Sequence, residues 1–155
     1  MGTVLPPFGW TQFVLAHSEE LRSNEPAPSV MRWTPSIARQ IGKINSDINA
    51  AIKFDPATTD REWMLSPKTG CCHDYVVSKR HALLKIGWPV SCLLIAEVHD
   101  ESDDEDVDHL VLICRTDKAN FVLDSKTDAM LSELPGNYTL KRIQTSDPAV
   151  WTDKC

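Results

Sequence analysis

The chain has 155 residues, of which 42% are hydrophobic and 25% are charged. This length and composition fit one globular domain with its own core and leave no room for a second one. We therefore expect a single domain over residues 1–155.

The net charge of −6 comes from one segment. Residues 100–108 hold seven acids, and removing them from the total leaves a charge of +1. A nearly neutral body has no basic surface for a phosphate backbone, so we expect no nucleic acid partner. We interpret the acidic run as a solvated loop between strands. Calcium capture is the weaker alternative, because the run lacks the glycine and the ligand spacing of an EF-hand loop.

The apolar segments and the cysteines exclude two further classes of protein. No apolar run reaches the roughly 18 residues that a membrane-spanning helix needs, so we expect no membrane span. The N-terminal residues lack the basic and apolar regions of a secretory signal. Five cysteines, without the spacing of a disulfide framework, predict free thiols. Cys92 and Cys114 lie in apolar strand patterns and are expected to be buried.

Three helices are predicted in the first half of the chain. Apolar residues recur at helical spacing over residues 9–21, which predicts a first helix. Thr34 and Pro35 then form an N-cap followed by proline at the first helical position. The second helix continues through isoleucines at intervals of three or four residues, at positions 37, 41, 44, 48 and 52. A third helix is predicted to begin at Cys71 or Cys72 and to stop before Gly87.

The second half of the chain changes to a β pattern. Residues 57–70 are expected to be irregular, with Trp63 and Met64 as apolar anchors. Four segments with the composition and length of strands follow, at residues 92–98, 109–115, 120–124 and 138–143. Helices that precede a sheet favour an α+β fold, in which N-terminal helices pack on a mainly antiparallel sheet.

Cys72, His109 and Asp124 are the candidate catalytic residues. They supply a nucleophilic thiol, a general base and a carboxylate that orients the base. Cys72 lies in the first turn of a predicted helix, where backbone N–H groups lower the pKa of a thiol. If residues 115–119 reverse the chain, Asp124 comes within a residue or two of the position opposite His109.

This combination allows acyl transfer. The sulfur of Cys72 would attack a carbonyl carbon, and backbone N–H groups at the helix start would stabilise the oxyanion. His109 would then protonate the leaving amine. Transfer of the acyl group to water makes a peptidase and transfer to an amine makes a transglutaminase, and the three residues do not choose between them.

Five short segments carry a family resemblance when they are read together. They are Gly70–Tyr75 (GCCHDY), Gly87–Pro89, Asp108–Leu112, Arg115–Asp117 and Phe121–Asp124. Together they resemble the bacterial transglutaminase-like cysteine peptidases over about residues 10–151. The resemblance implies a papain-like, transglutaminase-type core. It also implies that Cys72, His109 and Asp124 take the nucleophile, base and orienting positions.

The same resemblance implies a substrate, a compartment and a cation. The best-known branch of the family is a periplasmic protease that cleaves large surface adhesins, which implies a protein substrate and a periplasmic location. That branch binds calcium through acids that flank its cysteine. Here Cys71 and His73 stand at these positions and offer no carboxylate oxygen, so we expect no cofactor. Val14 and Leu21 replace a cysteine pair of the family, and with no leader seen, a cytoplasmic location is the alternative.

Other interpretations of the same residues stay open. Cys71, Cys72 and His73 could join His109 as soft ligands for zinc or copper, although adjacent cysteines differ from the spacing of common zinc sites. A binding or scaffold domain could keep the fold without turnover. His73 is either a surface residue or a second imidazole beside the thiol, and Asp74 is expected to favour the helix start as a first-turn acid.

Overall fold

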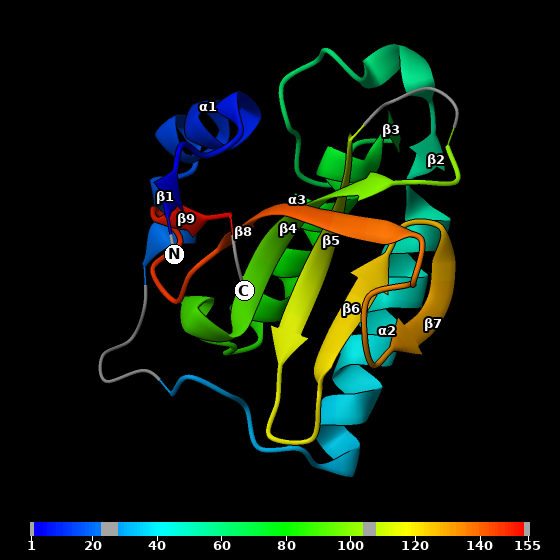
Figure 1. Ribbon diagram of the computed structural model, residues 1–155. Coiled ribbons are helices and arrows are strands. Elements are labelled where there is room, and N and C mark those ends of the chain that lie inside the picture. Colours follow the sequence, from blue (N-terminus) through cyan, green and yellow to red (C-terminus); the bar gives the residue numbers. More distant parts are fainter. Residues whose placement is uncertain (1, 23–27, 104–107, 154–155) are drawn as a thin grey trace.

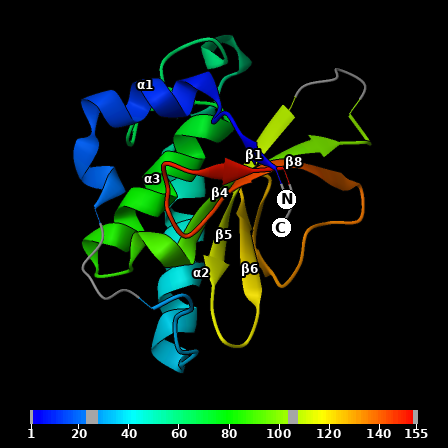
Figure 2. The same ribbon diagram turned by 60° about the vertical axis from the view of Figure 1, so that its left-hand side comes forward.

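The computed structural model describes residues 2–22, 28–103 and 108–153. These residues form a curved sheet with helices on one side (Figure 1). Within these ranges the main sheet has seven strands in the order β1-β9-β8-β4-β5-β6-β7. All neighbouring strands in it are antiparallel. Figures 1 and 2 place the α-helices together on one side of the sheet. The α+β fold predicted from the sequence is therefore confirmed.

The bounds of the elements follow the predicted order, with helices first. The helices are α1 (Phe8–Ala16), α2 (Pro35–Ala51) and α3 (Cys72–Lys85), with 3₁₀ turns η1 (Ser18–Leu21), η2 (Pro56–Thr58) and η3 (Val90–Cys92). The central strands are β4 (Leu93–Asp100), β5 (Asp108–Arg115), β6 (Asn120–Asp124), β7 (Thr127–Leu131) and β8 (Tyr138–Gln144). Short strands β1 (Thr3–Val4) and β9 (Trp151–Thr152) pair at one edge, and β2 (Lys53–Phe54) and β3 (Thr69–Gly70) form a separate parallel pair.

Helix α2 begins where the sequence predicts. The hydroxyl of Thr34 accepts a hydrogen bond from the backbone N–H of Ile37 at 3.1 Å, and Pro35 occupies the first turn. This satisfies one of the N–H groups that a helix start leaves without an intrahelical acceptor. The helix buries Ile41 against the core and ends at Ala51, one residue before the last isoleucine of the pattern.

The first predicted helix is interrupted at His17, so the prediction of one continuous helix is wrong. The backbone of His17 leaves the helical region, and η1 follows as a separate turn. That turn places the buried Glu20 beside two side chains of α3. A carboxylate oxygen of Glu20 lies 3.5 Å from the Arg80 guanidinium, and the other lies 2.9 Å from Nδ1 of His81. A buried ion pair therefore overrides the local helical periodicity.

Helix α3 begins at Cys72, as predicted, and its start is held by Asp74. The fully buried carboxylate of Asp74 accepts a hydrogen bond from the backbone N–H of Cys71 at 3.1 Å, which confirms its expected role in the first turn. A Cβ atom at Gly70 would lie 2.5 Å from an Asp74 oxygen, so this close approach requires glycine. Gly87, with a φ of 106°, follows the end of the helix, as predicted.

The central strands bury both of their faces. Alternate residues such as Ile95 and Leu112 pack under the helices, whereas Ala96 and Val111 belong to a second apolar cluster on the opposite face. The register of β4 with β8 shifts after Glu97, and such an irregularity bends a strand. In Figure 1, β8 crosses in front of β4 and β5, so the curvature of the sheet closes over the second cluster.

Several smaller expectations can be compared with the structure. Cys92 and Cys114 are buried free thiols, as predicted, whereas Cys155 lies outside the described residues. Met64 is 40% exposed and does not serve as an apolar anchor. Residues 104–107 of the acidic run also lie outside the described residues. No helix in the described ranges is both long enough and apolar enough to cross a membrane.

Candidate active site

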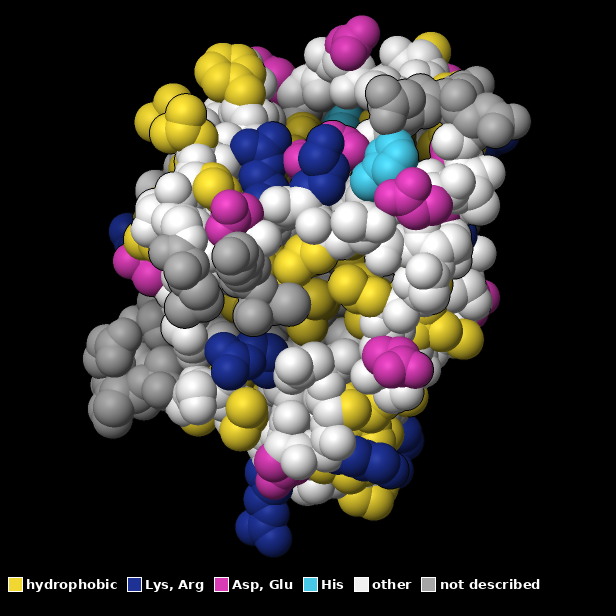
Figure 3. Space-filling view, viewed as in Figure 1, with side chains coloured by type: hydrophobic (Ala, Val, Ile, Leu, Met, Phe, Trp, Pro, Cys, Tyr) yellow, Lys and Arg dark blue, Asp and Glu magenta, His cyan; other side chains and the backbone are white. Residues whose placement is uncertain are grey.

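A cavity of about 620 Å³ lies where the start of α3 meets the β4–β5 end of the sheet. Its lining includes the three consecutive residues Cys71, Cys72 and His73, and His109 at the start of β5. Trp63 forms part of its wall. On the face of the molecule seen in Figure 3, basic and acidic side chains are intermixed. Two of the three candidate catalytic residues, Cys72 and His109, thus line the same cavity.

His109 and Asp124 meet as the hairpin prediction requires. Strands β5 and β6 pair with Leu112 opposite Leu123, which places Asp124 two residues from the position opposite His109. Nε2 of His109 lies 2.7 Å from a carboxylate oxygen of Asp124, and both side chains are buried. Since Nε2 is engaged by the carboxylate, Nδ1 is the ring nitrogen left for a reacting group.

Asp124 is held by more groups than His109 alone. Its second carboxylate oxygen accepts a hydrogen bond from the hydroxyl of Tyr138 at 2.6 Å, and the backbone N–H of Lys126 donates to the first oxygen at 3.0 Å. Burial opposes ionisation of Asp124, but the hydrogen bond and charge of His109, together with Tyr138, keep its pKa below the ordinary value. Asp124 is therefore a carboxylate with a fixed orientation.

Cys72 is the first residue of α3, and its sulfur lies on the His109 side of the helix start. Contact with Cys71 and burial raise the pKa of Cys72, and the backbone N–H of Leu110, the residue after His109, partly opposes this by favouring the sulfur anion. The backbone N–H of His73 acts in the same direction. The sulfur and the imidazole therefore line the same cavity from neighbouring positions of the structure.

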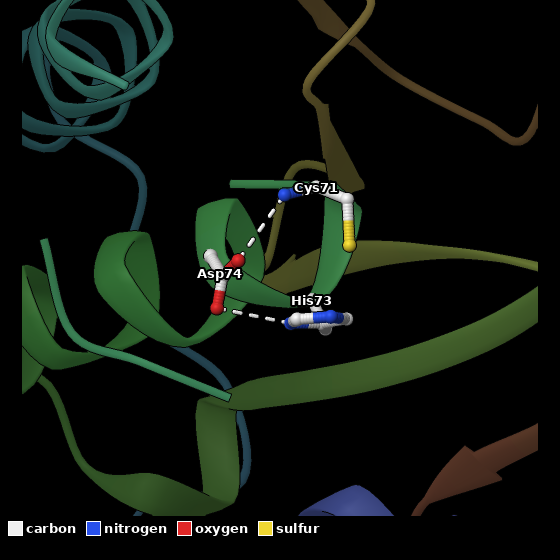
Figure 4. Close-up of side chains that lie close together, drawn as sticks. All are labelled: Cys71, His73 and Asp74. Atoms are coloured by element: carbon white, nitrogen blue, oxygen red, sulfur yellow. Dashed lines mark hydrogen bonds and ion pairs between the residues drawn. The ribbon is translucent and has the colours of Figure 1, made fainter. Parts of the chain in front are cut away.

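A second thiol, imidazole and carboxylate lie beside the first set. Potential ligand atoms of Cys71, His73 and Asp74 are within 4.8 Å of one another, and all three residues are buried. Figure 4 shows the sulfur of Cys71 pointing toward the His73 ring, while Nδ1 of His73 lies 3.0 Å from an Asp74 oxygen. The ring also stacks on Trp63 at 5.7 Å between centroids. His73 is thus the second imidazole beside a thiol, and it is not a surface residue.

The two adjacent thiols shift each other's pKa in opposite directions. A hydrogen bond from Cys72 lowers the pKa of the Cys71 thiol to about 4, and burial opposes this while His73 supports it. The contact with Cys71, followed by burial, raises the pKa of Cys72 well above its ordinary value. We expected the lowered pKa at Cys72, and this expectation is wrong because it left out the neighbouring thiol. Burial lowers the pKa of His73, but Asp74 and Cys71 outweigh it and raise the value to about 9.

The carboxylate in this cluster has little free capacity for a cation. One oxygen of Asp74 accepts from the backbone N–H of Met64 at 2.8 Å and faces Nδ1 of His73. The other accepts from the backbone N–H of Cys71 and from the Arg61 guanidinium at 3.3 Å. The oxygens of Asp74 are thus occupied by protein donors, which leaves sulfur and nitrogen as the free ligand atoms.

Sequence reasoning missed Tyr138 and the geometry of His73. Tyr138 starts a predicted strand, but no spacing in the chain indicates that its hydroxyl reaches Asp124. For His73 the only signal was its place one residue after Cys72. Side-chain direction at a helix start depends on packing, here against Trp63, so spacing alone could not decide it.

Solved structures with the same fold include LapG from Legionella pneumophila. A calcium-bound LapG structure matches with a TM-score of 0.60 and 22% identity, covering 72% of this chain and 66% of that one. An EGTA-treated LapG structure matches with the same TM-score and identity, covering 72% of this chain and 64% of that one. This chain therefore spans slightly less than two thirds of the LapG chains, and at this identity the likeness establishes the fold alone.

Sequence comparisons give one family and no individual relative. A search of curated proteins gave no match. The model of the family described as bacterial transglutaminase-like cysteine proteinase BTLCP matches residues 1–154. The chain therefore belongs to the bacterial transglutaminase-like cysteine proteinases, a family of cysteine peptidases.

Proposed function

We propose that this chain is a cysteine peptidase in which Cys72 is the nucleophile, His109 the general acid and base, and Asp124 the residue that orients His109. The observation that carries the proposal is the 2.7 Å contact between His109 and Asp124 at the cavity that Cys72 also lines. Family membership supports the reaction class.

The first half of the reaction forms a thioester. His109 takes the thiol proton of Cys72 through Nδ1, and the sulfur attacks the carbonyl carbon of a peptide bond. The sulfur anion is stabilised by the backbone N–H groups of Leu110 and His73. The backbone N–H of Cys72, in the first turn of α3, has no acceptor within the helix and can stabilise the tetrahedral oxyanion. His109 then protonates the leaving amine as the carbon–nitrogen bond breaks.

The second half releases the acyl group. A water molecule attacks the thioester while His109 accepts its proton, and the thiol of Cys72 leaves as a carboxylic acid forms. Asp124 holds the N–H of His109 Nε2 throughout and stabilises the charged imidazolium. Tyr138 fixes the carboxylate of Asp124 from the other side.

Cys71 is the rival nucleophile, because its pKa is the lower of the two. The imidazole beside Cys71, however, is that of His73, which stacks on Trp63 and is only 5% exposed. The backbone N–H groups of Leu110 and His73 favour the anionic form of Cys72. These features support Cys72 as the attacking sulfur.

The proposal extends to the substrate and to the compartment in which the protein acts. The family resemblance supports a protein substrate such as a surface adhesin, and with it a periplasmic location. The free thiols of the four cysteines within the described residues support the cytoplasm, where thiols stay reduced. Immunodetection of the protein in periplasmic and cytoplasmic fractions decides between them.

Calcium does not fit the residues beside Cys72. One LapG structure is calcium-bound, and calcium requires six to eight oxygen ligands. Here Cys71 and His73 supply sulfur and nitrogen, and the oxygens of Asp74 are occupied by protein donors. We therefore propose that this chain does not hold calcium at the Cys71–Asp74 cluster.

The test of the proposed function is cleavage of candidate surface proteins from the same cell. Wild type is expected to produce new fragments, Cys72→Ala to produce none, and Cys71→Ala to remain active as the matched control. Fragments from Cys72→Ala, or an inactive Cys71→Ala protein that is folded, would contradict the assignment. Adding a labelled primary amine separates the two acyl acceptors, since hydrolysis leaves the label free and amine transfer attaches it to the substrate.

A further inference from the structure

The Cys71–His73–Asp74 cluster has one ligand atom that the protein leaves without a partner. Nε2 of His73 is buried, and it has no hydrogen-bond partner among the residues that the structure describes. Leaving a buried polar atom unsatisfied destabilises the folded state. His73 contributes nothing to the proposed acyl transfer through this atom, so the free nitrogen points to a ligand of its own.

The other ring nitrogen is already arranged as in a metal site. Nδ1 of His73 lies 3.0 Å from an oxygen of Asp74, a contact that keeps a proton on Nδ1 and leaves Nε2 to bind a metal in exchange for its own proton. Histidines that bind metals almost always donate their second N–H to a carboxylate, backbone carbonyl or water in this way. Asp74 is held in place by the backbone N–H groups of Met64 and Cys71, so the imidazole has a rigid support.

The donor types select the class of cation. Thiolate and imidazole suit zinc and similar borderline or soft cations, whereas calcium and magnesium prefer oxygen. Bond lengths of about 2.3 Å to sulfur and about 2.1 Å to nitrogen place the ligand atoms of a tetrahedral zinc site roughly 3.5 Å apart. The Cys71 sulfur and a ring nitrogen of His73 lie within 4.8 Å of each other, so a small side-chain movement brings the sulfur and Nε2 to this separation.

We propose that Cys71 Sγ and His73 Nε2 bind a zinc-like divalent cation at the wall of the cavity, with Asp74 as the carboxylate behind the imidazole. The remaining coordination positions face the cavity of about 620 Å³, where water completes the set. His109 is not needed as a ligand, because its Nε2 is engaged by Asp124. The site therefore differs from the oxygen site that calcium requires, and its occupancy can be measured without a peptidase assay.

The experiment is a titration of metal-free, reduced protein with Zn²⁺ by calorimetry, with and without a large excess of Ca²⁺. Wild type is expected to bind one Zn²⁺ per chain with an affinity that Ca²⁺ leaves unchanged. Cys71→Ser and His73→Gln are expected to weaken binding by at least about tenfold. The matched controls are Cys92→Ser, whose hydroxyl can replace the thiol that donates to Pro28 at 3.4 Å, and His17→Gln, outside the cavity. Both should bind as wild type does.

A second measurement keeps the test independent of any loss of fold. Co²⁺ in place of Zn²⁺ gives a thiolate-to-metal absorption band, which is expected in wild type and in His17→Gln and lost in Cys71→Ser. Circular dichroism checks the fold of each variant. The proposal is overturned if wild type shows no saturable binding, if Ca²⁺ displaces the metal, or if a folded Cys71→Ser protein binds Zn²⁺ as tightly as wild type.

Discussion

Tyr138→Phe is the substitution that separates positioning of the catalytic imidazole from every other role of this side chain. Phenylalanine keeps the edge contact of the ring with His109, at 5.8 Å between centroids, and removes only the hydroxyl that donates to Asp124 at 2.6 Å. A hydrogen bond to a charged group contributes about 1.5–3 kcal/mol. If this is lost from the transition state, kcat/KM falls between about 10-fold and 160-fold.

The assay is steady-state cleavage of a peptide or protein substrate across pH. We expect the loss in kcat with little change in KM, because the hydroxyl acts on Asp124 and not on the substrate. Tyr75→Phe is the matched control, since this tyrosine also lines the cavity but its hydroxyl donates to the backbone oxygen of Ile52 at 2.8 Å and not to Asp124. A folded Tyr138→Phe protein with kcat within about twofold of wild type would refute the positioning argument.

Three further predictions follow from the charges. Cys71→Ala removes the contact that raises the pKa of Cys72, so the acidic limb of the kcat/KM profile should move to lower pH, and an unmoved limb would contradict the coupling of the two thiols. Glu20→Gln leaves Arg80 buried without its counter-charge and should cost about 3–5 kcal/mol in urea unfolding, whereas a loss below about 1 kcal/mol would show the pair to be unimportant. Asp124 has a lowered pKa, so its stabilisation is complete above its unfolded pKa of about 3.9 and is lost as the pH falls through the lower folded value. Asp124→Asn should therefore show a shallower loss of stability below about pH 4 than wild type, and identical acid unfolding curves would argue against it.

The fold was predictable from the sequence where a regular apolar pattern extends over many residues. The isoleucines of α2 and the apolar runs of β4, β5 and β6 each extend over several residues, and all of these elements form where the sequence places them. Strands of two residues, such as β1 and β9, are too short to have a period, and they exist because chain ends meet at the sheet edge. The interruption at His17 arises from burial of Glu20, a tertiary contact that local periodicity does not contain.

The candidate site was predictable where it depends on a hairpin. His109 and Asp124 lie on consecutive antiparallel strands, so counting residues through the turn brings them together. Tyr138 reaches Asp124 only because the sheet curves, since β4 and β5 lie between their strands. The pKa values of Cys71 and Cys72 depend on which sulfur faces which donor. Sequence spacing places both thiols at the helix start without giving that direction.

Reaction with a peptidyl vinyl sulfone, followed by mass-spectrometric mapping of the adduct, tests the central claim most directly. Such a probe binds as a substrate does and traps the attacking sulfur covalently. We predict one adduct on Cys72 in wild type and at least about a hundredfold slower reaction in His109→Ala, since the imidazole is the group that accepts the thiol proton. An adduct on Cys71, or an equal rate in a folded His109→Ala protein, would contradict the account.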